Sequence, residues 1–223
     1  KGCMQSQRFW VMAGWIAALR NKDIKSVLAD SPFFYFDDQW MVIMGLYAGI
    51  TVHVSEGMSV SRFLDWIEDH EIELAYFPTP ILETPPSSRE TATSLKKFIG
   101  FALNAELTRL VEERFNVLTR DSFGMTEVGV GLLVPDTVNS DAALDSCGLP
   151  APFRDVKIVD DNGNEVESGS PGELWIKGPG IINGYYKKPK ANKETFVDGW
   201  FRTGDVFIAD ALGFYTIVGR MKD

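Results

Sequence analysis

Hydrophobic and polar positions in the first half of the chain follow two alternating patterns. Short strand-like runs occur at residues 26–29, 51–54, 73–77 and 97–103. Residues 59–70 instead place apolar side chains at the spacing of one helix face, with Ser59 as the N-cap. Further helices are expected at residues 9–19 and 39–49 and after Asn104. Strands that alternate with helices predict a parallel sheet with crossover helices.

Beyond about residue 145 the pattern changes to closely spaced strands, and no segment has a convincing helical period. Asn162-Gly163 is flanked by residues 156–160 and 164–166, which predicts a hairpin because both residues tolerate positive φ. Further strands are expected at 172–177, 206–209 and 214–218. We therefore predict an α/β protein. Its parallel sheet with crossover helices occupies residues 1–144, and a small, mainly antiparallel, β-barrel-like subdomain occupies residues 145–220.

Composition narrows the class of protein. Of the 223 residues, 45% are hydrophobic and 24% are charged, as in soluble globular proteins. The formal net charge is -9 and no run of Lys and Arg could follow a phosphate backbone, so we expect no nucleic-acid partner. Cys3 and Cys147 form no CxxC motif, which favours a reducing, cytoplasmic setting. No apolar stretch approaches the ~18 to 20 residues of a membrane span.

The first candidate for chemistry is the segment at residues 121–127, which follows a strand-like run at 116–119. Gly124 lets a backbone approach a ligand, Thr126 can donate to an anionic oxygen, and Glu127 can hold Mg²⁺ through its carboxylate. At the end of a parallel strand, this combination suits a phosphate and its metal ion. A glycine turn followed by a helix-capping threonine is the alternative interpretation.

The second candidate is the segment at residues 199–205. It places Asp205 just before a strand, where the carboxylate could accept both hydroxyls of a ribose, although a solvated turn aspartate fits the same pattern. Arg220 follows the last strand and could reach the same sugar or its phosphate, while a surface arginine is also common there. The glycines of residues 169–184 are interpreted as hairpin turns and a bulge, because no Lys-Ser or Lys-Thr follows them.

Four motifs in a fixed order resemble those of the adenylate-forming superfamily of acyl-CoA synthetases, luciferases and peptide-synthetase adenylation domains. Phe123-Gly124-Met125-Thr126-Glu127 is similar to the family's Tyr-Gly-x-Thr-Glu motif. Residues 172–189 resemble its Gly-Glu-Leu...Gly-Tyr...Pro motif, and residues 201–205 and 219–220 resemble the next two. Four such motifs in order over about a hundred residues rarely arise by chance, so the chain is identified as a member of this superfamily.

Within the superfamily, residues 34–39 and Asn104 resemble carnitine- and crotonobetaine-CoA ligases. Two positions depart from the common family pattern. Tyr35 stands where many members have a histidine, and Phe101 brings a bulky ring to a position where small residues are frequent.

The resemblance implies a role for each residue of these motifs. Thr126 would contact the α-phosphate of ATP, Glu127 would hold the Mg²⁺, and Lys1 would end a phosphate loop as a third catalytic residue. Asp205 and Arg220 would hold the ribose. The other expected positions are Gly100, Phe123, Gly124 and Met125 for ATP or AMP, Tyr35, Phe36, Phe101 and Val128 for the acyl pocket, and Lys222, within residues 221–223, for a hinge.

The resemblance further implies that a small-molecule carboxylic acid is joined to CoA at the expense of ATP, with Mg²⁺ and through an acyl-adenylate. An adenylation domain that loads a carrier protein and a non-catalytic nucleotide-binding fragment are the alternatives, and a homodimer is left open. The sequence begins at Lys1-Gly2 without an initiator Met and does not include the family's C-terminal lysine domain. We therefore expect a fragment that is a poor catalyst of adenylation by itself.

Overall fold

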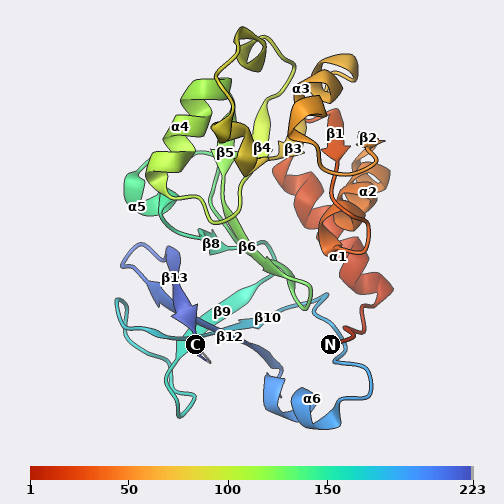
Figure 1. Cartoon of the computed structure of the whole chain (residues 1–223). Coiled ribbons are helices and arrows are strands. Elements are labelled where there is room, and N and C mark those ends of the chain that lie inside the picture. Colours follow the sequence, from red (N-terminus) through yellow and green to blue (C-terminus); the bar gives the residue numbers. More distant parts are fainter. Residues whose placement is uncertain (222–223) are drawn as a thin grey trace. The chain divides into compact units, whose positions relative to one another are not determined.

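The computed structural model describes residues 1–221, and the expected hinge residue Lys222 lies outside the described residues. The chain folds as two compact units. One comprises Ala13–Asp121, and the other combines Lys1–Met12 with the residues from Ser122 onward. One sheet belongs to the first unit and two sheets belong to the second (Figure 1). Each unit also has a cluster of buried apolar side chains. The limits of functional subdomains at residues 144, 145 and 220 stay a prediction.

The unit of Ala13–Asp121 is built on a five-stranded parallel sheet, as the alternating pattern predicts. Its strands follow the order β2-β1-β3-β4-β5, which reads from right to left in Figure 1. They are β1 (Ser26–Ala29), β2 (Thr51–Val54), β3 (Leu74–Tyr76), β4 (Lys97–Ile99) and β5 (Leu118–Arg120). The helices are α1 (Gln7–Arg20, which begins in the other unit), α2 (Phe36–Ala48), α3 (Val60–Asp69) and α4 (Ala105–Phe115), with 3₁₀ turns η1 (Thr79–Glu83) and η2 (Ser88–Thr91).

Helices cover both faces of this sheet. Phe63 of α3 and Phe115 of α4 join Phe98 of β4 in one buried cluster. Trp40 of α2 packs on the opposite face, because its partner Tyr76 follows the clustered Ala75 and successive strand residues face opposite ways. The two faces are therefore apolar, which explains why the strands read as continuous hydrophobic runs.

Helix starts in this unit match the capping residues chosen from the sequence. Asn104 precedes α4, and its Oδ1 accepts the N–H of Leu107 at 2.8 Å, as a capping asparagine does. Ser59 precedes α3 as predicted, but its side chain makes no capping hydrogen bond. The strand predicted to reach residue 103 ends at Ile99, because Ala102 takes a positive φ of 54°.

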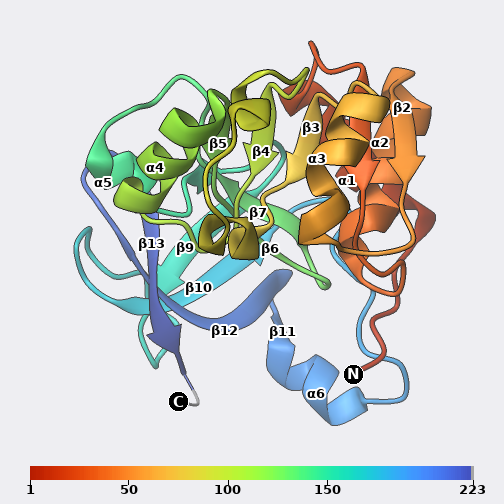
Figure 2. The same cartoon turned by 45° about the horizontal axis from the view of Figure 1, so that its top comes forward.

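The strand pairings of the second unit are antiparallel in the described residues, as predicted for the segment after residue 145. The β6–β7 pair, which lies in the part predicted to be a parallel sheet, is antiparallel as well. One sheet has the order β6-β7-β8, and the other has the order β11-β12-β10-β9, with β13 also paired to β12. The long, bent strand β12 is followed most easily in Figure 2. The elements are β6 (Ser122–Met125), β7 (Gly129–Leu133), α5 (Asp141–Leu144), β8 (Leu149–Pro150), β9 (Asp155–Val159), β10 (Gly172–Lys177), α6 (Pro189–Thr195), β11 (Phe196–Val197), β12 (Trp200–Ala209) and β13 (Tyr215–Arg220).

The hairpin predicted at Asn162-Gly163 is present. Val159 and Glu165 form an antiparallel bridge, the N–H of Asp160 donates to the carbonyl of Asn164 at 2.9 Å, and the N–H of Val166 donates to the carbonyl of Ile158 at 3.0 Å. Residues 164–166 contribute only this one bridge and no longer strand, whereas β9 pairs along its length with β10. One expectation for this unit is wrong, the absence of a helix, since α6 begins at Pro189. It buries no residue, so no apolar period marks it in the sequence.

Among residues 1–221, no helix combines the length and the apolar character that crossing a bilayer requires.

Candidate active site

Thr126 and Glu127 lie at the tip of the β6–β7 hairpin. The turn closes with a hydrogen bond from the N–H of Val128 to the carbonyl of Met125 at 3.1 Å. Gly124 is required beside it, because a Cβ there would come within 2.9 Å of the carbonyl oxygen of Gly129. No helix follows the turn, so Thr126 caps none, and the segment is a strand of its own rather than the end of parallel strand β5. The hairpin leaves Thr126 exposed and Glu127 half-buried.

The Glu127 carboxylate is held from the opposite side by Tyr185. The phenol of Tyr185 donates to Glu127 Oε1 at 2.8 Å, and the backbone carbonyl of Glu127 accepts the N–H of Ile182 at 2.9 Å. Burial, followed by the hydrogen bond to Glu127, raises the pKa of Tyr185 well above its ordinary value, so the phenol stays protonated at neutral pH. Lys1 Nζ lies 4.5 Å from the centre of the Tyr185 ring.

A buried arginine fixes the base of the same hairpin. The Arg154 guanidinium donates to the carbonyls of Val128 at 2.6 Å, Val130 at 3.1 Å and Pro179 at 2.5 Å. Burial lowers the pKa of Arg154 to about 10. The side chain therefore joins β7 to the segment after β10. Nothing in the sequence around Arg154 predicted this contact.

The Phe201–Asp205 motif forms a bulge inside β12, not a turn before a strand. Residues 203–205 of β12 lie opposite Leu174 alone, between the pairs Trp175–Arg202 and Glu173–Val206. Gly204 adopts a φ of 75°, which suits glycine. The Thr203 hydroxyl donates to the carbonyl of Leu174 at 2.7 Å and accepts the N–H of Asp205 at 3.1 Å, so it satisfies backbone groups that the bulge removes from the ladder.

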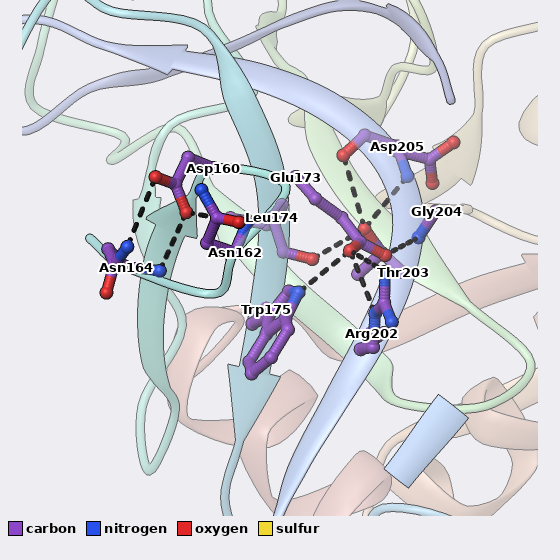
Figure 3. A network of polar contacts seen from close by, with 10 residues as sticks. All are labelled: Asp160, Asn162, Asn164, Glu173, Leu174, Trp175, Arg202, Thr203, Gly204 and Asp205. Atoms are coloured by element: carbon purple, nitrogen blue, oxygen red, sulfur yellow. Dashed lines mark hydrogen bonds and ion pairs between the residues drawn. The ribbon is translucent and has the colours of Figure 1, made fainter. Parts of the chain in front are cut away.

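Glu173 completes the bulge from the neighbouring strand β10, as Figure 3 shows. Its Oε1 accepts the N–H of Gly204 at 3.0 Å. Its Oε2 accepts from Trp175 Nε1 at 2.9 Å and from Arg202 Nε and Nη2 at 2.9 and 2.8 Å. Four donors thus converge on one buried carboxylate. Glu173 belongs to the Gly-Glu-Leu motif, which is the signal that could have identified it.

Asp205 emerges from the bulge and meets Arg220. Its side chain is 6% exposed, and its Oδ1 accepts from Arg220 Nε at 2.6 Å. The two residues are also backbone register partners of β12 and β13. The two residues predicted to share a site are therefore in direct contact. The alternative interpretation, a solvated aspartate in a turn, is wrong because Asp205 is buried and lies within β12.

Glu127, Tyr185, Glu173 and Arg220 border one cavity of about 630 Å³. Its walls include both ends of the motif series, which lie far apart in the sequence: Lys1, Glu127, Tyr185, Glu173, Gly204 and Arg220. A cavity of this size is in the range of small-molecule sites. The carboxylate oxygens of Glu127 are of the kind that Mg²⁺ prefers, so this part of the cavity suits that ion.

The remaining predicted positions lie elsewhere. Phe123 packs edge-to-face on Phe207, and Val128 is fully buried in the same core. In the parallel-sheet unit, Gly100 follows β4 and Phe101 stacks on Tyr76, with ring centres 5.1 Å apart. Tyr35 is the N-cap and Phe36 the first residue of α2. Their roles as nucleotide or acyl contacts stay predictions.

Comparison with known proteins agrees with the motif series. A model of the AMP-binding enzyme family matches residues 1–186. A long-chain-fatty-acid–CoA ligase of Yersinia pestis is 40% identical over 119 residues, which cover 52% of this chain and 21% of that protein. A feruloyl-CoA synthase of Amycolatopsis sp is 30% identical over 203 residues, which cover 88% of this chain and 41% of that protein.

Solved structures give the same result for the fold. The O-succinylbenzoate coenzyme A synthetase of Bacillus subtilis in complex with ATP and magnesium ion is 25% identical, with a TM-score of 0.88 over 99% of this chain and 47% of that chain. The chain belongs to the AMP-binding enzyme family. It spans less than half the length of the relatives described here.

Proposed function

We propose that the chain is part of an ATP-dependent acyl-CoA synthetase, in which it supplies the ribose and metal contacts. The observation that carries the proposal is the single cavity bordered by Glu127, Arg220 and Lys1, with Asp205 held beside it by Arg220. This arrangement combines an oxygen donor for a metal, a carboxylate for ribose hydroxyls and cationic groups for phosphate, which are the contacts that a nucleoside triphosphate requires.

In the proposed reaction, a carboxylate oxygen of the substrate attacks the α-phosphorus of ATP, and the bond to pyrophosphate breaks. The CoA thiol then attacks the acyl carbon, and AMP leaves. Thr126 and Lys1 would bind phosphate oxygens, and Asp205 would orient the ribose. Glu127 would hold Mg²⁺, which when bound neutralises phosphate charge. The first step needs no general base because the attacking carboxylate is already ionised at neutral pH.

The acyl acceptor in this proposal is CoA, because the relatives described above are named as CoA ligases or CoA synthetases. A carrier protein is the alternative acceptor. The names of the relatives range from long-chain fatty acids to feruloyl and succinylbenzoate groups, so the proposal extends to an organic carboxylic acid and no further. A cytoplasmic location, a hinge at Lys222 and a homodimer stay predictions.

The test uses the natural protein that carries this chain, with ATP, Mg²⁺, CoA and a panel of carboxylic acids. We expect one acid to give equal amounts of pyrophosphate and acyl-CoA. Pyrophosphate release without acyl-CoA would instead indicate an adenylation domain that loads a carrier protein. AMP binding with no pyrophosphate release from any acid would indicate a non-catalytic nucleotide-binding module.

A further inference from the structure

Tyr185 is a buried tyrosine whose hydroxyl donates a hydrogen bond to the carboxylate of Glu127. It is 4% exposed, and its phenol lies 2.8 Å from Glu127 Oε1. Tyr185 and Glu127 come from segments 58 residues apart in the sequence. Both border the same cavity. The contact therefore links the Gly-Tyr motif to the Thr-Glu motif.

The backbone of Tyr185 is held on two sides. Its N–H donates to Asn192 Oδ1 at 2.7 Å, and its carbonyl accepts from Asn192 Nδ2 at 3.1 Å. The side chain of Asn192, in α6, therefore binds both backbone polar groups of Tyr185. On the other side, Cys3 forms a β-bridge with Tyr185, and Tyr186 N–H donates to the carbonyl of Gly2 at 2.8 Å. The phenol oxygen is thus presented from a fixed position.

The backbone of Glu127 is fixed as well, by Ile182 and, through the carbonyl of Val128, by Arg154. These bonds do not restrict the rotamers of the Glu127 side chain. A ligand that requires one rotamer therefore has to offset the loss of side-chain entropy. The hydrogen bond from Tyr185 selects an orientation by engaging Oε1. The Cys3 thiol also faces this carboxylate, and its pKa is raised by burial and then by the charge of Glu127.

We propose that Tyr185 is a positioning residue that orients the Glu127 carboxylate for Mg²⁺. The inference rests on the proposed function, since it assumes that Glu127 holds the metal of Mg²⁺–ATP. Groups that hydrogen-bond a metal-binding side chain typically change metal affinity by 10–100-fold when removed. Tyr185 acts through Glu127 and touches neither substrate nor metal.

The experiment measures ATP binding to the 223-residue chain by calorimetry over a range of Mg²⁺ concentrations, and AMP binding without metal. The variant is Tyr185→Phe, which removes only the hydroxyl. Tyr186→Phe is the matched control, because Tyr186 is the next residue and is 59% exposed. We expect Tyr185→Phe to raise the Mg²⁺ concentration of half-maximal effect by about 10-fold. We expect its AMP affinity, and both properties of Tyr186→Phe, to equal those of the unaltered chain.

A second comparison tests whether Tyr185 acts through Glu127. In a Glu127→Gln background, Tyr185→Phe should have no further effect on the Mg²⁺ response, because the two residues form one coupled pair. An unchanged Mg²⁺ response in Tyr185→Phe alone would overturn the inference. So would an equal loss of AMP affinity, which would indicate a merely structural role.

The outcomes also separate this inference from the proposed function. If the unaltered chain binds AMP but its ATP affinity ignores Mg²⁺, the metal role of Glu127 and the positioning role of Tyr185 are both wrong, while the nucleotide site stands. If AMP fails to bind at all, the nucleotide site itself is wrong.

Discussion

The guanidinium of Arg220 lies 2.6 Å from the buried carboxylate of Asp205, across paired strands β12 and β13. The arginine side chain is 58% exposed, whereas the aspartate is almost fully enclosed. Water can therefore solvate the charge of Arg220 when the pair is broken, but it cannot reach the carboxylate of Asp205.

Arg220→Ala should weaken nucleotide binding and also lower stability. The variant leaves the enclosed Asp205 carboxylate without its cation, which costs about 1–3 kcal/mol of unfolding free energy. Loss of the cation that orients Asp205 should lower AMP affinity by about 10-fold, as removal of one charged hydrogen bond does. Calorimetry with AMP and a denaturant titration measure the two effects. A large loss of stability with unchanged AMP affinity would contradict this assignment.

Glu173→Ala should destabilise the bulge that carries Asp205. Arg202, Trp175 and the N–H of Gly204 would all lose the carboxylate, and Trp175 and Gly204 would have to find water in a region that is now enclosed. We expect the free energy of unfolding to fall by about 2–3 kcal/mol. Urea unfolding followed by tryptophan fluorescence measures it. Glu167→Ala, at an exposed position, is the control and should change little.

Arg154→Met should loosen the β6–β7 hairpin. The methionine keeps most of the buried volume but leaves the carbonyls of Val128, Val130 and Pro179 without their donor. We expect a loss of about 3 kcal/mol in unfolding free energy. Hydrogen exchange of β7 amides should also accelerate. Lys193→Met removes the same charge from an exposed site, so an equal effect of both variants would show that charge, not the carbonyl contacts, matters.

Acidification should stabilise the parallel-sheet unit over part of the pH range. Burial raises the pKa of Asp38 to about 7 and that of Asp30 to about 6, and the like charge of Asp30 adds to the shift of Asp38. Asp37 and the phenol of Tyr76 also face this group. Because both folded pKa values exceed the unfolded value near 4, the folded state binds more protons between about pH 4 and 7. Stability therefore falls as pH rises through this window.

Asp38→Asn tests the sign of this dependence. The amide cannot ionise, so the variant should be more stable than the parent by about 1–3 kcal/mol at pH 8, and the difference should shrink towards pH 4. Denaturant titrations at several pH values measure it. A variant that is less stable than the parent at pH 8 would mean that the carboxylate is ionised and well paired in the fold.

The sequence was sufficient where a residue's environment follows from its neighbours. Ser26–Ala29 and Thr51–Val54 are strands with the predicted limits. Ser26–Ala29 is buried at every position, as a strand inside a parallel sheet is, and Thr51–Val54 forms the edge of that sheet. Asn104 was identifiable as a cap because capping is a contact between adjacent residues. The motif series also identified Glu127, Asp205 and Arg220, which border or adjoin one cavity.

The sequence was insufficient where geometry depends on distant partners. The Thr203-Gly204-Asp205 segment resembles a turn locally, and only pairing with β10 makes it a bulge. Helix α6 was missed because it buries no residue, so no apolar period marks it in the sequence. Arg154 and Tyr185 act on groups more than twenty residues away, so no local pattern could assign their contacts.

The most direct test of the central claim is calorimetric titration of the chain with AMP, in parallel with Asp205→Ala and with Asp210→Ala, whose aspartate lies in the turn between β12 and β13. The account predicts that the unaltered chain and Asp210→Ala bind AMP alike. It predicts that Asp205→Ala loses at least about 10-fold in affinity, because the ribose hydroxyls lose their charged acceptor. Equal AMP affinity in all three proteins, or no binding by any of them, would contradict the assignment of this cavity as a nucleotide site.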